Sequence, residues 1–231
     1  MARFAPQVFH ENDAGFHLVA RTGEAARSAL NALLKSWHEA GVFSRWRGEE
    51  LDVLDPETFA PLFPLEREGR VLLGLTMTGA LLNGAVIGDG ALHLWIAQRA
   101  KNKSIAPLQW DCLANGAVGT GETAREALAR EAWEEAGVPE NLLEHAVSAA
   151  QFTITHHDGE YVFYERAHCF DVTLPASFAP FNHDGEVERF ELATISRLHA
   201  MLEEGAFTLD ASLAIKNWLG RNEMGLNVAK A

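Results

Sequence analysis

The stretch 116–138 constrains this chain more than any other part of its sequence. It opens with a glycine-rich turn, in which the backbone can bend sharply and approach other groups closely, with Gly116, Gly119 and Gly121. A helix should follow, because Thr123 and Glu126 have the spacing of a capping box and Gly137 stands where a left-handed cap ends a helix. The sequence therefore predicts a glycine-rich turn that leads directly into one short helix.

This predicted helix carries three carboxylates on one face. At about 100° per residue, Glu131, Glu134 and Glu135 fall within about a quarter of its circumference. Such like charges cost roughly 0.2–0.5 kcal/mol per pair, and Arg130 is the only basic residue close enough along the helix to offset them. A hard divalent cation such as Mg²⁺ takes carboxylate oxygens as ligands and would compensate the charge. The alternative is a solvated acidic helix end.

The whole stretch resembles the Nudix box, whose pattern is Gly-x5-Glu-x7-Arg-Glu-U-x-Glu-Glu-x-Gly-U, where U is an aliphatic residue. The fixed positions are matched in register by Gly116, Glu122, Arg130, Glu131, Glu134, Glu135, Gly137 and Val138. Ala132 departs from the pattern, since the family usually carries a bulkier aliphatic residue there. The resemblance implies an α/β fold, the Nudix α/β/α sandwich with a mixed sheet.

Apolar runs and turn residues after residue 70 predict the strands of such a sheet and two further helices. We expect strands at 71–78, 80–87, 91–97, 151–155, 161–172 and 186–193. We expect the later helices at 196–204 and 209–219. The Nudix domain is therefore assigned to 73–222 and a C-terminal tail to 223–231.

The part of the chain before this sheet predicts a small N-terminal α+β domain at 1–72. Leucines and a tryptophan at helical spacing predict a helix over 22–41. Three prolines interrupt the sequence further on, so we expect a boundary or linker at about 55–72.

The net charge of the chain argues against general nucleic-acid binding. The 231-residue chain has a formal net charge of −13, whereas general nucleic-acid binding depends on a basic surface. No apolar run approaches the about 20 residues of a membrane span, and the first residues lack the apolar core of a signal peptide. Cys112 and Cys169 form no metal-type pair and are expected to be reduced. We therefore expect a cytoplasmic protein that binds neither nucleic acid nor membranes.

A local basic cluster precedes the glycine-rich turn. Arg99, Lys101 and Lys103 stand at every second position, so they would point one way if the segment were extended. A solvated loop is one interpretation of this cluster, and diphosphate binding is the other. Because the cluster comes just before the turn, we predict that these three residues bind substrate.

A second resemblance extends over about 40–220. This part of the chain is similar to a Nudix branch that is found fused to, or associated with, thiamine pyrophosphokinase in fungi. The branch is related to stand-alone plant and bacterial proteins and carries an N-terminal domain of its own. The segments that carry the resemblance are 45–53, 79–84, 95–99 and 182–188. The segments 107–109 and 114–115 depart from the branch near the expected substrate.

The superfamily resemblance implies hydrolysis of a diphosphate joined to another moiety, with Mg²⁺ or Mn²⁺ as cofactor. The branch implies thiamine diphosphate or its oxidised derivatives as the small-molecule substrate, cleaved to the monophosphate and phosphate. By the same resemblance, Glu131 and Glu135 bind the metal directly, and the carbonyl group of Gly116 is a further ligand. Glu134 is either a third ligand or the base that positions water.

The resemblance also implies supporting roles. Arg130 would orient the glutamates through ion pairs, and Glu122 would hold the loop against the helix. An acidic residue outside the box often completes such sites. Glu165 is the first candidate for this role, with Glu186 and Glu188 behind it.

Other functions stay open at this stage. One is a pyrophosphatase for ADP-ribose or a related dinucleotide. Another is a binding module that keeps the fold without turnover, which the intact carboxylate set disfavours. An isomerase with the same fold is a weaker alternative and would need Cys112 or Cys169 to act. The oligomeric state is also open, with a homodimer among the options.

Overall fold

The computed structural model describes residues 5, 7–13, 15–20, 22–43, 46, 48–88, 90–158 and 161–228 of the chain. The chain divides into two compact units. The first unit comprises Met1–Met77, Gly119–Gly121 and Thr155–Glu165. The second unit comprises Thr78–Val118, Glu122–Ile154 and Arg166–Ala231.

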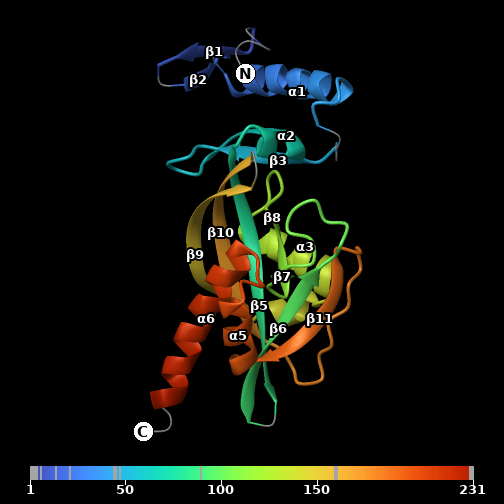
Figure 1. The fold of residues 1–231 in the computed structure, drawn as a ribbon, viewed down its shortest axis with the longest axis vertical. Helices are drawn as coiled ribbons and strands as arrows, with labels where there is room; N and C mark the ends of the chain where they lie inside the picture. The colour runs from blue at the N-terminus through green and yellow to red at the C-terminus, as the bar shows by residue number, and fades with distance from the viewer. Residues whose placement is uncertain are drawn as a thin grey trace. The chain divides into compact units, whose positions relative to one another are not determined.

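Within its described residues before residue 73, the first unit contains two small antiparallel sheets and two helices (Figure 1). Its elements are β1 (Phe9–Asn12), β2 (Gly15–Leu18), α1 (Gly23–Glu39), β3 (Glu50–Leu54), β4 (Pro61–Glu66) and α2 (Arg67–Leu72). The helix predicted over 22–41 is confirmed as α1, and the hydroxyl of Thr22 caps its first turn by accepting a hydrogen bond from the N–H of Ala25 at 3.2 Å. The apolar side of α1 is buried in a core that includes Leu30, Leu33, Leu34, Val53 and Leu65.

The linker expected at 55–72 is wrong, because β4 and α2 occupy 61–72. Pro61 and Pro64 both lie within β4, which pairs with β3 in a sheet that has two strands among the described residues. A sheet of two strands has only edge strands, where a residue without an N–H can be accommodated. These prolines therefore mark an edge strand and not an irregular segment.

In the part of the chain that the structure describes, the large sheet has seven strands. They are β5 (Thr76–Gly88), β6 (Ala91–Arg99), β7 (Trp110–Asp111), β8 (Ala114–Ala117), β9 (Val147–Asp158), β10 (Tyr161–Thr173) and β11 (Val187–Thr194). Their order is β11-β6-β5-β10-β9, and β7 pairs with β6 while β8 pairs with β5. The strands predicted at 71–78 and 80–87 form one strand, β5, because Gly79 stays in the ladder opposite Ala117. The start of the first prediction is wrong, because residues 71–72 lie in α2 and β5 begins at Thr76.

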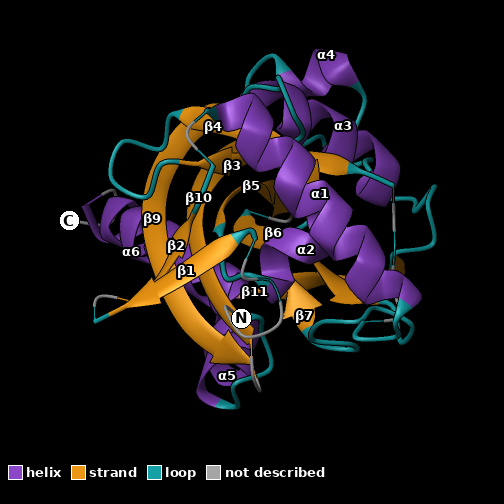
Figure 2. Ribbon diagram, turned by 90° about the horizontal axis from the view of Figure 1, so that it is seen from above, coloured by secondary structure: helices purple, strands orange, loops and turns teal. Residues whose placement is uncertain are grey.

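Strand β5 shows how this mixed sheet is covered on both faces. Leu81 and Ala85 belong to a core with residues of α5 (Ile195–Glu203) and α6 (Leu209–Val228). Leu82 and Val86, on the opposite face, belong to a core with residues of α3 (Ala124–Ala136). Figure 1 shows α3 on one side of these strands and α5 and α6 on the other. The short helix α4 (Glu140–Leu143) follows α3 and lies beside it (Figure 2).

The α/β/α sandwich predicted from the sequence is thus confirmed. The later helices predicted at 196–204 and 209–219 correspond to α5 and α6, and α6 continues to Val228.

Candidate metal centre

The glycine-rich turn leads into α3 as the sequence predicts. The hydroxyl of Thr123 accepts a hydrogen bond from the N–H of Glu126 at 3.2 Å, and the carboxylate of Glu126 accepts one from the N–H of Thr123 at 2.8 Å. Gly137 ends the helix in a left-handed conformation with φ of 63°. Both ends of α3 are therefore fixed by local sequence, which sets the direction of its side chains.

Two carboxylates of α3 are buried against the start of β8. The exposed fractions of Glu131 and Glu135 are 9% and 6%. The backbone N–H of Asn115 donates a hydrogen bond to Oε2 of Glu135 at 2.8 Å. Gly116 lies directly against Glu131, because a Cβ atom at position 116 would be 1.8 Å from the carboxyl carbon of that glutamate. The structure therefore needs glycine at position 116 to make room for a carboxylate.

Arg130 binds three carboxylates at once. It donates to Glu131 at 2.6 Å and to Glu134 at 3.4 Å, and it donates two hydrogen bonds of 2.9 Å to Glu122. A further bond of 3.0 Å reaches the carbonyl oxygen of Ala117. The hydrogen bonds with Glu122 are the largest reason why the pKa of Arg130 is raised, although burial opposes the shift. Arg130 is thus a permanent cation that ties the glycine-rich turn to the acidic face of α3.

A loop between β10 and β11 is bound to the end of α3. The N–H of Phe181 donates to the carbonyl oxygen of Ala136 at 3.0 Å, and the N–H of His183 donates to that of Glu134 at 2.8 Å. The ring of His183 stacks on Trp133 with a centroid distance of 4.6 Å. The last carbonyl groups of a helix lack partners within it, so this loop satisfies two of them. It is therefore held in one place relative to α3.

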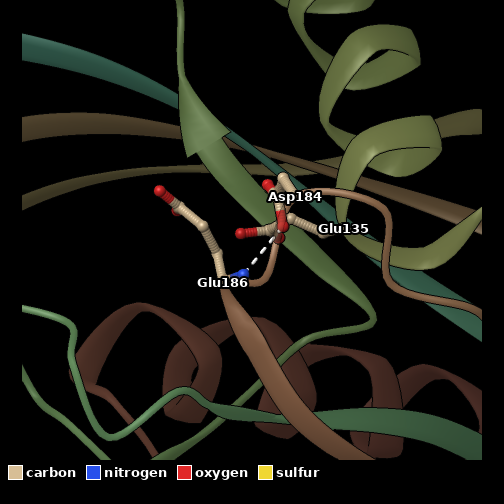
Figure 3. Close-up of side chains that lie close together, drawn as sticks. All are labelled: Glu135, Asp184 and Glu186. Carbon is tan, nitrogen blue, oxygen red and sulfur yellow. Dashed lines mark hydrogen bonds between the residues drawn. The ribbon is translucent and has the colours of Figure 1, made fainter.

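The bound loop brings two more carboxylates to Glu135 (Figure 3). Carboxylate oxygens of Glu135, Asp184 and Glu186 lie within 4.8 Å of one another. The N–H of Glu186 donates to Oδ1 of Asp184 at 2.8 Å, and the side-chain oxygen of Asn182 accepts from the N–H of Asp184 at 3.2 Å. Mg²⁺ binds oxygens at about 2.1 Å, so two opposite ligands are about 4 Å apart. A small closure of these side chains would enclose such an ion.

The buried charges of Glu131 and Glu135 also suit a divalent cation. Burial is the largest cause that raises the pKa of Glu135 well above its ordinary value, and the neighbouring Glu131 raises it further. The N–H of Asn115 and the ammonium of Lys103 oppose this shift without cancelling it. A hard divalent cation with carboxylate ligands would remove the cost of the two buried negative charges. The residues present therefore fit Mg²⁺ or Mn²⁺.

The side chains of the basic cluster, Arg99, Lys101 and Lys103, do not point the same way, because the segment is not extended. Strand β6 ends at Arg99, and a turn follows. Arg99 is internal, with an ion pair to Asp111 at 3.0 Å and hydrogen bonds to the carbonyl oxygen of Ile105. Lys101 is exposed, and Lys103 forms an ion pair with Glu186. Binding of substrate by these residues stays a prediction, for which the geometry favours Lys103.

A polar network behind β8 was missed by sequence reasoning. Asp111 is 4% exposed and accepts hydrogen bonds from the side chain of Asn115 at 3.1 and 3.3 Å. The backbone of the same asparagine holds Glu135, so the ion pair of Arg99 and Asp111 supports the position of a carboxylate of α3. No spacing in the sequence indicates this network, because its members come from separate strands.

Asp210, at the start of α6, is a neighbour of this network and makes the stability of the protein depend on pH. Burial raises its pKa to about 6, and Asp111 adds to the shift, while Arg99 and Asn115 oppose it. Between the ordinary value of 3.8 and this raised value, the folded protein binds more protons than the unfolded chain. The contribution of Asp210 to stability therefore falls as the pH rises through this window. Above the window, the charged carboxylate destabilises the folded protein to its full extent.

We predict that Asp210→Asn stabilises the protein at neutral pH by roughly 1–3 kcal/mol, because it removes a charge that is unfavourable in the folded state. Urea unfolding from acidic to neutral pH would measure the effect, which should vanish below the ordinary pKa of an aspartate. Glu203→Gln, at an exposed position of α5, is the control and should change stability by less than about 0.5 kcal/mol. A variant that is less stable than the wild type at neutral pH would contradict the prediction.

Glu165, the first candidate for an acidic residue outside the box, belongs to the first unit. It is 8% exposed on β10. In that unit lies the buried Arg70, whose pKa is lowered to about 10, mainly by burial, while Asp52 and Glu165 favour its charged form. A structural role as a counter-charge thus stands beside the predicted role of Glu165. Glu186 is part of the carboxylate cluster, whereas Glu188 is not among its members.

An α/β/α sandwich with a carboxylate helix packed on a glycine-rich turn defines the class of this protein. The family model of the NUDIX domain matches residues 83–213, which is more than half of the chain. The chain belongs to the NUDIX family.

Two curated relatives agree with this assignment, and a solved structure shares the fold. The chain is 30% identical over 209 residues to Nudix hydrolase 20, chloroplastic, of Arabidopsis thaliana, a match that covers 89% of this chain and 55% of the relative. It is 32% identical over 201 residues to Nudix hydrolase 24, chloroplastic, of the same plant, with 86% and 55% covered. The crystal structure of DR0079 from Deinococcus radiodurans has the same fold, with a TM-score of 0.59 and 23% identity over 73% of this chain and 98% of that one.

The plant relatives are longer than this chain, and their names state a location. The chain spans about 55% of the length of each plant relative. Both plant proteins are named chloroplastic, so the expected cytoplasmic location of this chain stays a prediction. Within the residues that the structure describes, no helix combines the length and the apolar character that crossing a membrane requires.

Proposed function

We propose that this protein hydrolyses the diphosphate of a small organic molecule with Mg²⁺ or Mn²⁺. One observation carries the proposal. The carboxylates of Glu131 and Glu135 are buried together in a NUDIX fold, with Gly116 against the first and Asp184 and Glu186 beside the second. A binding module without turnover has no need of this costly arrangement.

Each residue of the centre has a role in the proposed reaction. Glu131, Glu135 and the carbonyl group of Gly116 would hold the metal, with Glu134 as a third ligand. A bound divalent cation neutralises charge on phosphate oxygens and lowers the pKa of a water molecule. Glu134, whose side chain is 43% exposed and only weakly bound to Arg130 at 3.4 Å, is alternatively the base that positions this water. Arg130 holds Glu122, Glu131 and Glu134 in place.

The substrate that we propose is thiamine diphosphate or one of its oxidised derivatives, which would give the monophosphate and phosphate. The support for it is the resemblance of the segments 45–53, 79–84, 95–99 and 182–188 to the thiamine-associated branch. The segment 182–188 contains Asp184 and Glu186, so part of this resemblance lies in the carboxylate cluster itself. We propose Lys103 as a contact of the terminal phosphate.

The test is phosphate release from a panel of diphosphates with Mg²⁺, with Glu131→Gln as the inactive control. The panel contains thiamine diphosphate, its oxidised analogues, ADP-ribose and NADH, and release of nucleoside monophosphates is measured in parallel. We expect turnover of the thiamine compounds that depends on the metal and is lost in the variant. Turnover of ADP-ribose alone would keep the chemistry and overturn the substrate. A protein that hydrolyses nothing in the panel while it binds these ligands would support the binding module.

A further inference from the structure

Lys103 lies inside the carboxylate cluster and not on the surface. Only 14% of its side chain is exposed, which is unusual for a lysine. Its ammonium group forms an ion pair and hydrogen bond with the carboxylate of Glu186. The backbone fixes this pair, because the N–H of Ala100 donates to the carbonyl oxygen of Glu186 at 2.9 Å and the N–H of Lys103 donates to that of Ala100 at 3.1 Å.

The partner of Lys103 is also one of the three carboxylates that could hold a metal. Oxygens of Glu186 lie within 4.8 Å of those of Glu135 and Asp184. An ammonium group and a divalent cation that share one carboxylate repel each other strongly in a partly buried site. The two cations therefore compete for Glu186.

The two basic side chains of the centre, Arg130 and Lys103, differ in their freedom to move. Arg130 is held by Glu122, Glu131 and a carbonyl oxygen at distances of 2.6 to 3.0 Å. The ammonium group of Lys103 pairs with the carboxylate of Glu186, and a lysine has a flexible four-carbon stem that can turn to another anion. Lys103 is thus the cation that can leave, whereas Arg130 stays.

We propose that Lys103 is an internal counter-ion that a divalent metal displaces from Glu186, and that the displaced ammonium group binds the terminal phosphate of the substrate. The binding of the terminal phosphate rests on the proposed function, whereas the displacement of Lys103 from Glu186 does not. Metal binding would then prepare the site for an anionic substrate in two ways, since it adds positive charge and releases a lysine. In the metal-free protein the same lysine stabilises the acidic cluster.

The test is calorimetric titration of the full chain with Mn²⁺ in the absence of substrate. Removal of the competing cation by Lys103→Gln should tighten Mn²⁺ binding by about five- to tenfold. Lys101→Gln removes the same charge from an exposed position two residues away and should change the affinity less than about twofold. Lys103→Arg keeps the charge and should also stay within about twofold of the wild type. Weaker or unchanged binding by Lys103→Gln, or equal effects at both lysines, would overturn the proposal.

A double-mutant cycle identifies the carboxylate from which the lysine is displaced. Glu186→Gln alone should weaken Mn²⁺ binding, and in this background Lys103→Gln should have less than about a twofold effect. If Lys103→Gln tightened Mn²⁺ binding in the Glu186→Gln background as much as in the wild type, displacement from Glu186 would be overturned. Circular dichroism of each variant checks that it folds.

The two proposals can fail separately. If the wild type binds no Mn²⁺, both the displacement and the metal-dependent hydrolysis fail. If the displacement is observed but no diphosphate is hydrolysed, only the proposed function fails. Inorganic diphosphate binding, measured with saturating Mn²⁺, should weaken in Lys103→Gln, and unchanged binding would overturn the second half of the proposal.

Discussion

Glu135→Gln is expected to lower metal-dependent hydrolysis at least about a hundredfold while the fold is kept. The proposed ligand loses its charge, but the amide oxygen of the new side chain can still accept the hydrogen bond that the N–H of Asn115 donates at 2.8 Å. Packing against β8 is preserved because the two side chains have nearly the same size. The loss should therefore be in the chemistry and in metal binding, not in folding.

The stability of this variant separates a metal ligand from a structural residue. Burial raises the pKa of Glu135 above its ordinary value of 4.5, so between these two values the folded protein binds more protons than the unfolded chain. Its contribution to stability thus falls as the pH rises through this window, and the charged form is unfavourable in the metal-free protein. We expect the variant to be at least as stable as the wild type at neutral pH without metal. Unlike the wild type, it should gain no stability from Mg²⁺.

Thermal unfolding with and without Mg²⁺, together with steady-state hydrolysis, measures both effects. Glu140→Gln, at an exposed position of α4, is the control and should keep activity and the stabilisation by Mg²⁺. Activity within about tenfold of the wild type in Glu135→Gln would show that this carboxylate is not a metal ligand.

Gly116→Ala should have the second large effect, a loss of metal affinity of at least about tenfold. The added Cβ atom would lie 1.8 Å from the carboxyl carbon of Glu131 and about as close to its oxygens, at 2.1 and 2.3 Å. Because the obstacle is the end of a flexible side chain, Glu131 can turn away at a moderate cost in stability. In doing so it would leave the position next to Glu135 and disturb its short bond with Arg130.

Calorimetric titration with Mn²⁺ would test this prediction, with urea unfolding as the measure of stability. Gly88→Ala is the matched control, because the nearest atom to a Cβ there is Nδ1 of His93 at 4.0 Å. It should change neither metal affinity nor stability by much. Wild-type metal affinity in Gly116→Ala would contradict the proposed role of the close contact between this glycine and Glu131.

The sequence predicts the helix of the site well because the determinants are local. A capping box, a terminal glycine and a short spacing between carboxylates are all contained in 116–138, and each is present in the structure. The strands and helices that were predicted after residue 90 are also found close to their predicted positions, because their apolar patterns are regular, whereas β7, β8 and α4 were not predicted. The prolines at 61 and 64 misled the prediction, because their effect depends on whether a strand is at an edge, which tertiary structure decides.

The rest of the site depends on contacts between distant segments. The pairing of Lys103 with Glu186 and of Asp111 with Asn115 arises from the folding of separate loops and strands onto α3. The segment 182–188 resembles a family branch, but its sequence does not indicate that Asp184 and Glu186 meet Glu135, which the bound loop shows. The short alternation of basic residues was also misleading, because β6 ends at Arg99 and the alternation does not continue into the turn.

The most direct test of the central claim is the position of Mn²⁺ in crystals of this protein, located by anomalous diffraction. We predict that the metal is bound by the carboxylates of Glu131 and Glu135, with Asp184 or Glu186 within reach of the same site. Binding of Mn²⁺ away from both glutamates, or no bound Mn²⁺ at saturating concentration, would contradict the account.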